Sequence, residues 1–169
     1  MRPFCTACAA QVGDGAAPRT ATLACFLTKW QCASIDPLLR DEWRGAEPRG
    51  VKRLFGFQGT LDEFMASDAS LETRGPVDRL VVLCVHTHAR FVGPSAVDRV
   101  RARYGDPETC VVALPCCARV RPERDMGRKP DTAYRDDCVF SEKRKVQVWR
   151  FGAGPTPPPC PVPGAFAGA

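Results

Sequence analysis

The residues of this chain best suited to chemistry follow a short apolar run. Residues 80–85 are six consecutive apolar residues, and the run breaks into His86-Thr87-His88, which holds both histidines of the chain. A valine-rich run of this length predicts a strand buried on both faces, as in a parallel sheet. Open α/β sheets bind ligands beyond the carboxyl ends of their strands, so we expect His86 and His88 at the mouth of a site. The alternative is a pair of loop histidines that merely follow a strand.

A second strand end carries two thiols. Residues 109–114 predict the next strand, and Cys116 and Cys117 come shortly after it. Consecutive strands of a doubly wound sheet are usually neighbours, so the four side chains His86, His88, Cys116 and Cys117 are expected to converge. They form a candidate reactive centre, because a nearby imidazolium lowers the pKa of a thiol. Two alternatives stay open: the same four side chains could bind a metal ion, or the cysteines could be inert core residues.

A glycine turn follows the first predicted strand, residues 4–12. Gly13-Asp14-Gly15 is a turn signal, and Pro18 suits the first turn of a helix. A strand, a glycine turn and a helix in this order leave backbone amides and a helix N-terminus free for a nucleotide-like ligand. The helix should present one apolar face, since apolar residues recur at helical spacing at Leu23, Phe26, Leu27 and Trp30.

Asp36 follows the second predicted strand, residues 32–35. An acid at that strand end, roughly 20 residues after a glycine turn, is placed to accept hydrogen bonds from ribose hydroxyls. With Pro37 it is also a good N-cap for a helix over residues 38–44. Both roles remain open, and they are not exclusive.

The remaining elements complete an alternating pattern. Residues 52–58 predict a third strand, and Thr60 and Glu63 then form a capping box at the start of a helix. Five strands alternate with four helical segments through short crossovers. The sequence therefore predicts an α/β fold with a doubly wound, mostly parallel sheet.

These motifs together resemble class I S-adenosylmethionine-dependent methyltransferases. The match lies in the glycine turn at residues 13–15, Asp36 after the second strand, and Gln58-Gly59-Thr60 after the third. Residues 133–151 resemble the antiparallel hairpin that closes this Rossmann-like fold, so the likeness covers roughly residues 4–151.

The resemblance implies S-adenosylmethionine as cofactor. Gly13 and Gly15, with Asp14 between them, would pass under its methionine part, and Asp36 would hold the ribose. Gln58-Gly59-Thr60 would flank the adenine, although the family often has an aspartate where Thr60 stands. His86 is a further candidate for cofactor binding. The Asn/Asp-Pro-Pro-aromatic motif of the amino-group methyltransferases is absent, because this chain has His86-Thr87-His88-Ala89 there.

Three functions follow. The first is methyl transfer to an unknown acceptor, which needs the acceptor held in line, water excluded and one proton removed, for instance by a histidine. The second is a non-catalytic module that binds the cofactor and acts by contact. The third is a metal-binding protein that uses His86, His88, Cys116 and Cys117.

Charge and composition limit the partners. The net charge is +5, and residues 119–150 hold ten basic and six acidic residues, so a nucleic acid could bind there. The alternative is a solvated loop of mixed charge. No apolar run is long enough to cross a membrane and no signal-peptide pattern begins the chain, so we expect an intracellular protein. Residues 1–151 should form one domain, followed by a disordered proline- and glycine-rich tail at residues 152–169.

Overall fold

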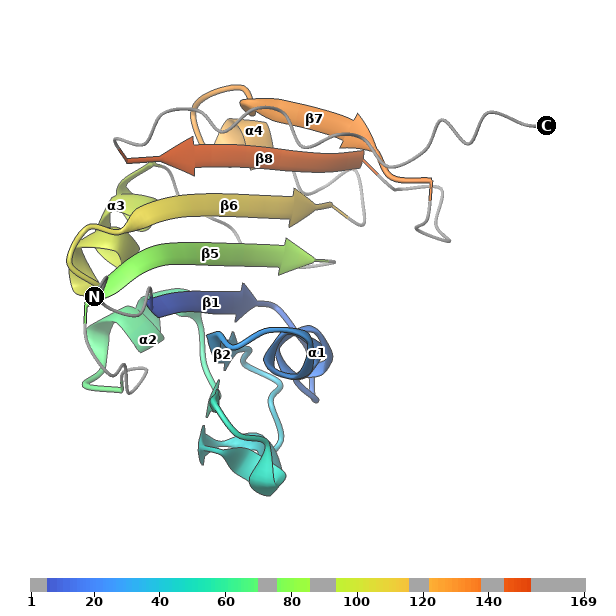
Figure 1. Cartoon of the computed structure of the whole chain (residues 1–169), viewed down its shortest axis with the longest axis vertical. Helices are drawn as coiled ribbons and strands as arrows, with labels where there is room; N and C mark the ends of the chain where they lie inside the picture. The colour runs from blue at the N-terminus through green and yellow to red at the C-terminus, as the bar shows by residue number, and fades with distance from the viewer. Residues whose placement is uncertain (1–5, 70–75, 86–93, 116–121, 138–144, 153–169) are drawn as a thin grey trace, which may run out of the picture.

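The computed structural model describes residues 6–69, 76–85, 94–115, 122–137 and 145–152. This part of the chain forms an eight-stranded sheet in the order β3-β4-β2-β1-β5-β6-β8-β7 (Figure 1). The strands are β1 (Thr6–Val12), β2 (Gln31–Ile35), β3 (Gly45–Ala46), β4 (Leu54–Phe57), β5 (Val77–Val85), β6 (Glu108–Leu114), β7 (Thr132–Arg135) and β8 (Lys145–Phe151). The α-helices are α1 (Arg19–Leu27), α2 (Leu61–Ala66), α3 (Pro94–Arg103) and α4 (Pro122–Asp125), with 3-10 turns η1 (Asp41–Trp43) and η2 (Pro48–Gly50).

The sheet is mostly parallel. Strands β4, β2, β1, β5 and β6 all run in one direction. At one edge β3 is antiparallel to β4, and near the other β8 is antiparallel to both β6 and β7. The expected α/β fold with a closing antiparallel hairpin is therefore confirmed. Because β1 lies between β2 and β5, the strand order reverses there, and ligands of doubly wound sheets bind at such switch points.

Two hydrophobic clusters lie on opposite faces of the sheet. The larger one packs the strands against α2 and α3, through side chains such as Phe64 and Val97. The smaller one lies under α1 and includes Cys25 and Leu54. Helices on both faces are what doubly wound topology requires, because each crossover must pass over one side of the sheet.

Two arginines satisfy the carboxyl ends of helices. Arg53 donates to carbonyl oxygens at the end of α1, that of Cys25 at 2.6 Å and that of Thr28 at 3.2 Å. Arg103 of α3 donates to carbonyls at the end of α2, including that of Met65 at 3.0 Å. A cation placed there pairs with unsatisfied carbonyls and with the negative end of the helix dipole. These bonds anchor α1 and α2, which flank the sheet on its two faces.

The expected helix over residues 38–44 is wrong. A turn follows Asp36, and the only helical geometry in this stretch of the described chain is the single 3-10 turn η1. The backbone amide of Arg40 donates to the carbonyl of Ala16 at 3.1 Å, which draws the segment toward the glycine turn. The carbonyl of Trp43 lies directly against Gly56 of β4. These tertiary contacts outweigh the local helix-start signal.

The expected orientation of α1 is also wrong. The residues that α1 buries are Ala21 and Cys25, whereas the predicted core face of Leu23, Phe26 and Leu27 is exposed to solvent. Trp30 lies beyond the last residue of the helix. Small side chains let α1 approach the sheet closely, and the large apolar residues are left on its outer side.

Strand β5 is buried on one face only, contrary to the expectation for residues 80–85. Leu80, Val82 and Cys84 are buried, and they alternate with half-buried Val81 and Leu83. The buried side chains belong to the larger cluster under α2 and α3. The opposite face of this part of the sheet is incompletely covered.

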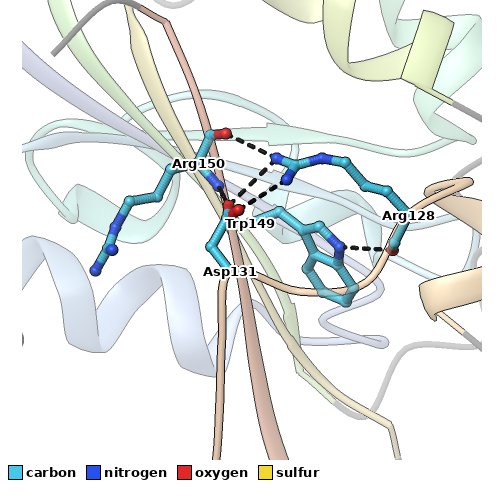
Figure 2. Close-up of polar contacts among 4 residues, drawn as sticks. All are labelled: Arg128, Asp131, Trp149 and Arg150. Atoms are coloured by element: carbon cyan, nitrogen blue, oxygen red, sulfur yellow. Dashed lines mark hydrogen bonds and ion pairs between the residues drawn. The ribbon is translucent and has the colours of Figure 1, made fainter. Parts of the chain in front are cut away.

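A polar network fixes the segment before β7 onto β8 (Figure 2). The Arg128 guanidinium donates to both carboxylate oxygens of Asp131, at 2.8 and 3.3 Å, and to the carbonyl of Arg150 at 2.8 Å. Asp131 also accepts from the backbone amide of Arg150 at 2.6 Å. The fully buried Trp149 donates its indole N–H to the carbonyl of Arg128 at 3.1 Å. The network joins the closing hairpin to the loop that precedes it.

The Asp131 network should make stability depend on pH. The hydrogen bond from Arg128 holds the pKa of the Asp131 carboxyl below its usual range. A carboxyl with a lowered folded-state pKa stabilises the fold above its unfolded-state pKa, and this contribution is lost as pH falls through the folded-state value. We expect the free energy of unfolding of Asp131→Asn to fall less on acidification than that of the wild type, in urea titrations at several pH values. Equal acid dependence of the two proteins would contradict this role.

The basic third of the chain is not an uninterrupted cationic surface where the structure describes it. Three of its basic residues form ion pairs: Arg128 with Asp131, Lys145 with Glu123 at 3.3 Å, and Arg135 with an acidic neighbour at 3.4 Å. Interspersed ion pairs of this kind are what the alternative, a solvated loop of mixed charge, predicts. The structure therefore gives no support to a nucleic-acid partner at residues 119–150. Among the described residues, no helix is long and apolar enough to span a membrane.

Candidate functional site

The glycine turn after β1 lies at the carboxyl edge of the sheet, at the switch point. Gly13 and Gly15 both have φ of +82°, a conformation that side chains beyond glycine rarely adopt. The amide of Gly13 donates to the carbonyl of Ile35 at 2.9 Å, which ties the turn to the end of β2. A Cβ built on Gly15 would meet nothing within 4 Å, so the space beside this turn is open to a ligand.

Asp36 joins three strand ends. Its carboxylate accepts from the amide of Gly15 at 2.8 Å and from the amide of Leu38 at 2.7 Å. Its backbone amide donates to the carbonyl of Phe57 at 3.1 Å, and its carbonyl accepts from the amide of Gly59 at 3.1 Å. The residue is buried, with 7% of its surface exposed. The turns after β1, β2 and β4 therefore form one connected unit with Asp36 at its centre.

Each Asp36 oxygen keeps a further acceptor position. An ionised carboxylate offers about four lone-pair positions, and the two backbone amides use one on each oxygen. The hydrogen bond that the backbone amide of Leu38 donates to the Asp36 carboxylate makes Asp36 a cap of the turn that replaces the expected helix. Capping and ligand binding are compatible here, as the sequence left open.

The Asp14 carboxylate binds backbone amides at the start of α1. Its carboxylate oxygens accept from the first free helix amides, those of Thr20 at 3.0 Å and Ala21 at 3.1 Å. The hydroxyl of Ser34 lies 3.4 Å from the same carboxylate. The sequence led us to expect these helix amides to be free for a ligand. The structure shows that the chain's own carboxylate takes two of them, so Asp14 acts as the cap that Pro18 cannot provide.

We expect Asp14→Ala to lower the free energy of unfolding by roughly 1–2 kcal/mol, the cost of removing a helix cap. The matched control is Asp98→Ala, an exposed aspartate of α3 whose contact with Arg101 is at 4.0 Å. Such a surface pair contributes about 0–1 kcal/mol. Thermal and urea unfolding measure both variants, and equal losses would contradict the capping role of Asp14.

The turn after β4 contains Gln58, Gly59 and Thr60. Gln58 is exposed, and Gly59 is buried where an added Cβ would lie 2.6 Å from the Phe57 ring. Thr60 accepts from the amide of Glu63 at 3.2 Å, and its own amide donates to the Glu63 carboxylate at 2.7 Å. The predicted capping box is confirmed. Thr60 is thus committed to the start of α2, while Gln58 is free to face a ligand.

His86, His88, Cys116 and Cys117 lie outside the described residues. The strands that lead to them are described: β5 and β6 are parallel neighbours, with Val85 opposite Leu114 in register. The prediction that these strands lie side by side is therefore confirmed. Their convergence on a reactive centre or metal site remains a prediction, and within the described ranges no three metal-ligating side chains come together.

Leu38 is a residue that the sequence reasoning missed. It is 73% exposed and follows the buried Asp36 by two positions, so the chain presents a large apolar side chain to solvent shortly after the carboxylate. The hydrogen bond from its backbone amide to the Asp36 carboxylate fixes the backbone at this point. The available signal was an apolar residue just after a strand-end acid, which the assumption of a helix obscured.

Comparison with known proteins identifies the architecture. No family model and no curated protein matches the chain. The crystal structure of a point mutant of MtNAS aligns with 89% of this chain, at 12% sequence identity and a TM-score of 0.50. The fold is Rossmann-like. The alignment covers 55% of that chain, so this chain spans about half the length of MtNAS. At this identity the likeness concerns the fold alone.

Proposed function

We propose that this protein binds S-adenosylmethionine at the carboxyl edge of β1, β2 and β4 and transfers its methyl group to an acceptor. The observation that carries the proposal is the connection of Gly15, Asp36 and Gly59 through hydrogen bonds of 2.8 and 3.1 Å. A glycine turn, a strand-end carboxylate and a third strand end are held as one unit, next to open space at Gly15. This is the arrangement that the resemblance to class I methyltransferases implies.

Different residues would bind different parts of the cofactor. In this proposal Gly13 and Gly15 pass under the methionine part, because their φ strongly favours glycine and a Cβ would narrow the space. The free acceptor positions of Asp36 take the ribose hydroxyls. Leu38 offers an apolar surface for the adenine, and Gln58 a polar edge. Each role uses a group that the fold leaves available.

Methyl transfer requires few further groups from the chain besides those that bind the cofactor. When bound, S-adenosylmethionine supplies an electrophilic methyl group. The chain must then hold the acceptor in line, exclude water and remove a proton. His86 is the next residue in the sequence after β5, the strand that pairs with β1, and an imidazole titrates in the range a general base needs. His88, Cys116 and Cys117, which follow β5 and β6 in the sequence, are the further candidates.

The test is calorimetric titration of the purified chain with S-adenosylmethionine and with S-adenosylhomocysteine. We expect both to bind with micromolar affinity and to raise the melting temperature. If neither compound binds, the proposal is wrong. Binding without methyl transfer to any acceptor, followed with a labelled methyl group, would leave cofactor binding in place and remove catalysis.

A further inference from the structure

The face of β5 and β6 opposite α2 and α3 is apolar and only partly covered. Its residues alternate with the buried ones and are all half-buried: Val81, Leu83 and Val85 in β5, and Cys110, Val112 and Leu114 in β6. They lie next to one another in register, and none belongs to either hydrophobic cluster. In Figure 1 no described helix lies in front of these strands, since α1 contacts β1, β2 and β4 instead.

Helix α1 is apolar on two sides. Ala21 and Cys25 face the sheet. At 100° per residue, the three large residues of the helix point the opposite way, and they are strongly exposed: Leu23 by 56%, Phe26 by 75% and Leu27 by 74%. A helix that is apolar all round is typically buried between two layers. Here the described chain supplies only one of them.

We propose that two copies of this chain pair so that α1 of each packs its outer face on the β5–β6 face of the other. The two helices would then lie side by side in one layer between two sheets. Each copy supplies the helix that the other copy's strands lack, and each covers the exposed side of the other's α1. The contact is isologous, as expected for a two-fold symmetric dimer.

The positions of α1 and the open face fix the direction of the symmetry axis. Both features lie on the same side of the sheet, α1 over β1, β2 and β4, and the open face over β5 and β6. A two-fold axis parallel to the strands exchanges these two halves and places each helix over the other copy's β5 and β6. An axis across the strands would set the two α1 helices on top of each other, where they collide.

The area suffices for a weak but specific dimer. The three exposed side chains of α1 offer roughly 250 Å² of apolar surface. The β5–β6 face is about 20 Å long and two strands wide, which adds roughly 200–250 Å². Two copies thus bury about 1,000 Å² in total, near the lower bound of specific interfaces. The rim carries an opposite-charge pair, Arg79 and Glu108 at 3.6 Å, and so brings no net charge of its own to the contact.

The experiment is sedimentation equilibrium of the whole chain across a concentration series that reaches about 0.2 mM, because interfaces of this size associate weakly. The variant is Phe26→Glu with Leu27→Glu, whose side chains are exposed and tolerate the change in the monomer. The control is Ala102→Glu, an exposed residue of α3 on the opposite side of the sheet. We expect wild type and control to reach twice the chain mass, and the double variant to remain at the monomer mass with an unchanged circular dichroism spectrum.

Alkylation of Cys110 provides a second readout, because this thiol lies on β6 and not on the mutated helix. We expect its labelling to slow as the concentration of the wild type rises, and not to depend on concentration in the double variant. A wild type that remains monomeric at all concentrations would overturn the proposal, and the open face would then belong to another polypeptide segment. A double variant that still dimerises, or unchanged Cys110 protection, would overturn it equally.

Discussion

Replacing Gly56 by alanine should destabilise the fold more than any other single methyl addition to the described glycines. A Cβ at Gly56 would lie 1.6 Å from the carbonyl oxygen of Trp43, 2.8 Å from its carbonyl carbon and 3.1 Å from Leu39. The nearest atoms belong to backbone, which cannot rotate away as a side chain can. Overpacking of a well-packed core costs about 1–3 kcal/mol, and we expect Gly56→Ala to reach at least the upper end of that range.

Gly45→Ala is the matched control for Gly56→Ala, because Gly45 of β3 pairs with Gly56 in register. Gly45 has φ of +79° but nothing within 4 Å of an added Cβ, so its substitution costs only backbone strain of about 1–2 kcal/mol. Urea unfolding of both variants separates the two effects. Equal losses of stability would show that η1 does not pack against β4 as the structure has it.

The second large effect is expected from Asp36→Ala. We expect the affinity for S-adenosylmethionine to fall by about 1–3 kcal/mol, roughly 5- to 150-fold, because charge-assisted hydrogen bonds to the ribose are lost. The variant also leaves the amides of Gly15 and Leu38 without their carboxylate partner. The turn that should carry the methionine part is then loosened as well, so both binding contributions decrease together.

Two further variants serve as comparisons for Asp36→Ala. Asp36→Asn keeps one acceptor oxygen and removes the charge, so it should bind the cofactor with intermediate affinity. Asp41→Ala removes a neighbouring carboxylate, 87% exposed, that pairs with Arg44 at 3.3 Å and should change nothing in binding. Titration calorimetry measures all three. A folded Asp36→Ala protein with wild-type affinity would reduce Asp36 to a cap of its turn.

Three strands and one helix start could be predicted from this sequence because they depend on local patterns. The apolar runs before Gly13, Asp36 and Gln58 are strands, and the capping box at Thr60 forms as predicted. Periodicity identifies which residues share a face, but it does not say which face is buried. In α1 the larger residues looked like the core face, and the structure buries Ala21 and Cys25 instead.

The site could be predicted only in outline. The sequence placed Gly13, Asp36 and Gln58 at strand ends, and the neighbouring order of β1, β2 and β4 brings those ends together. It could not show that Asp14 turns its carboxylate toward α1, because that depends on the path of the turn. Nor could it show the contact of Trp43 with Gly56, which joins residues of different elements and replaces the expected helix.

The Asp14 carboxylate also affects which ligands can bind at the carboxyl edge of the sheet. In dinucleotide-binding sheets the pyrophosphate lies against the free amides at the start of the first helix. Here those amides are satisfied internally, at 3.0 and 3.1 Å, by a group that is itself anionic. A phosphate approaching this helix would meet repulsion in place of donors, whereas a ligand without phosphate and with a cationic sulfonium would not. We therefore expect nicotinamide and flavin dinucleotides to bind this edge less well than a ligand without phosphate.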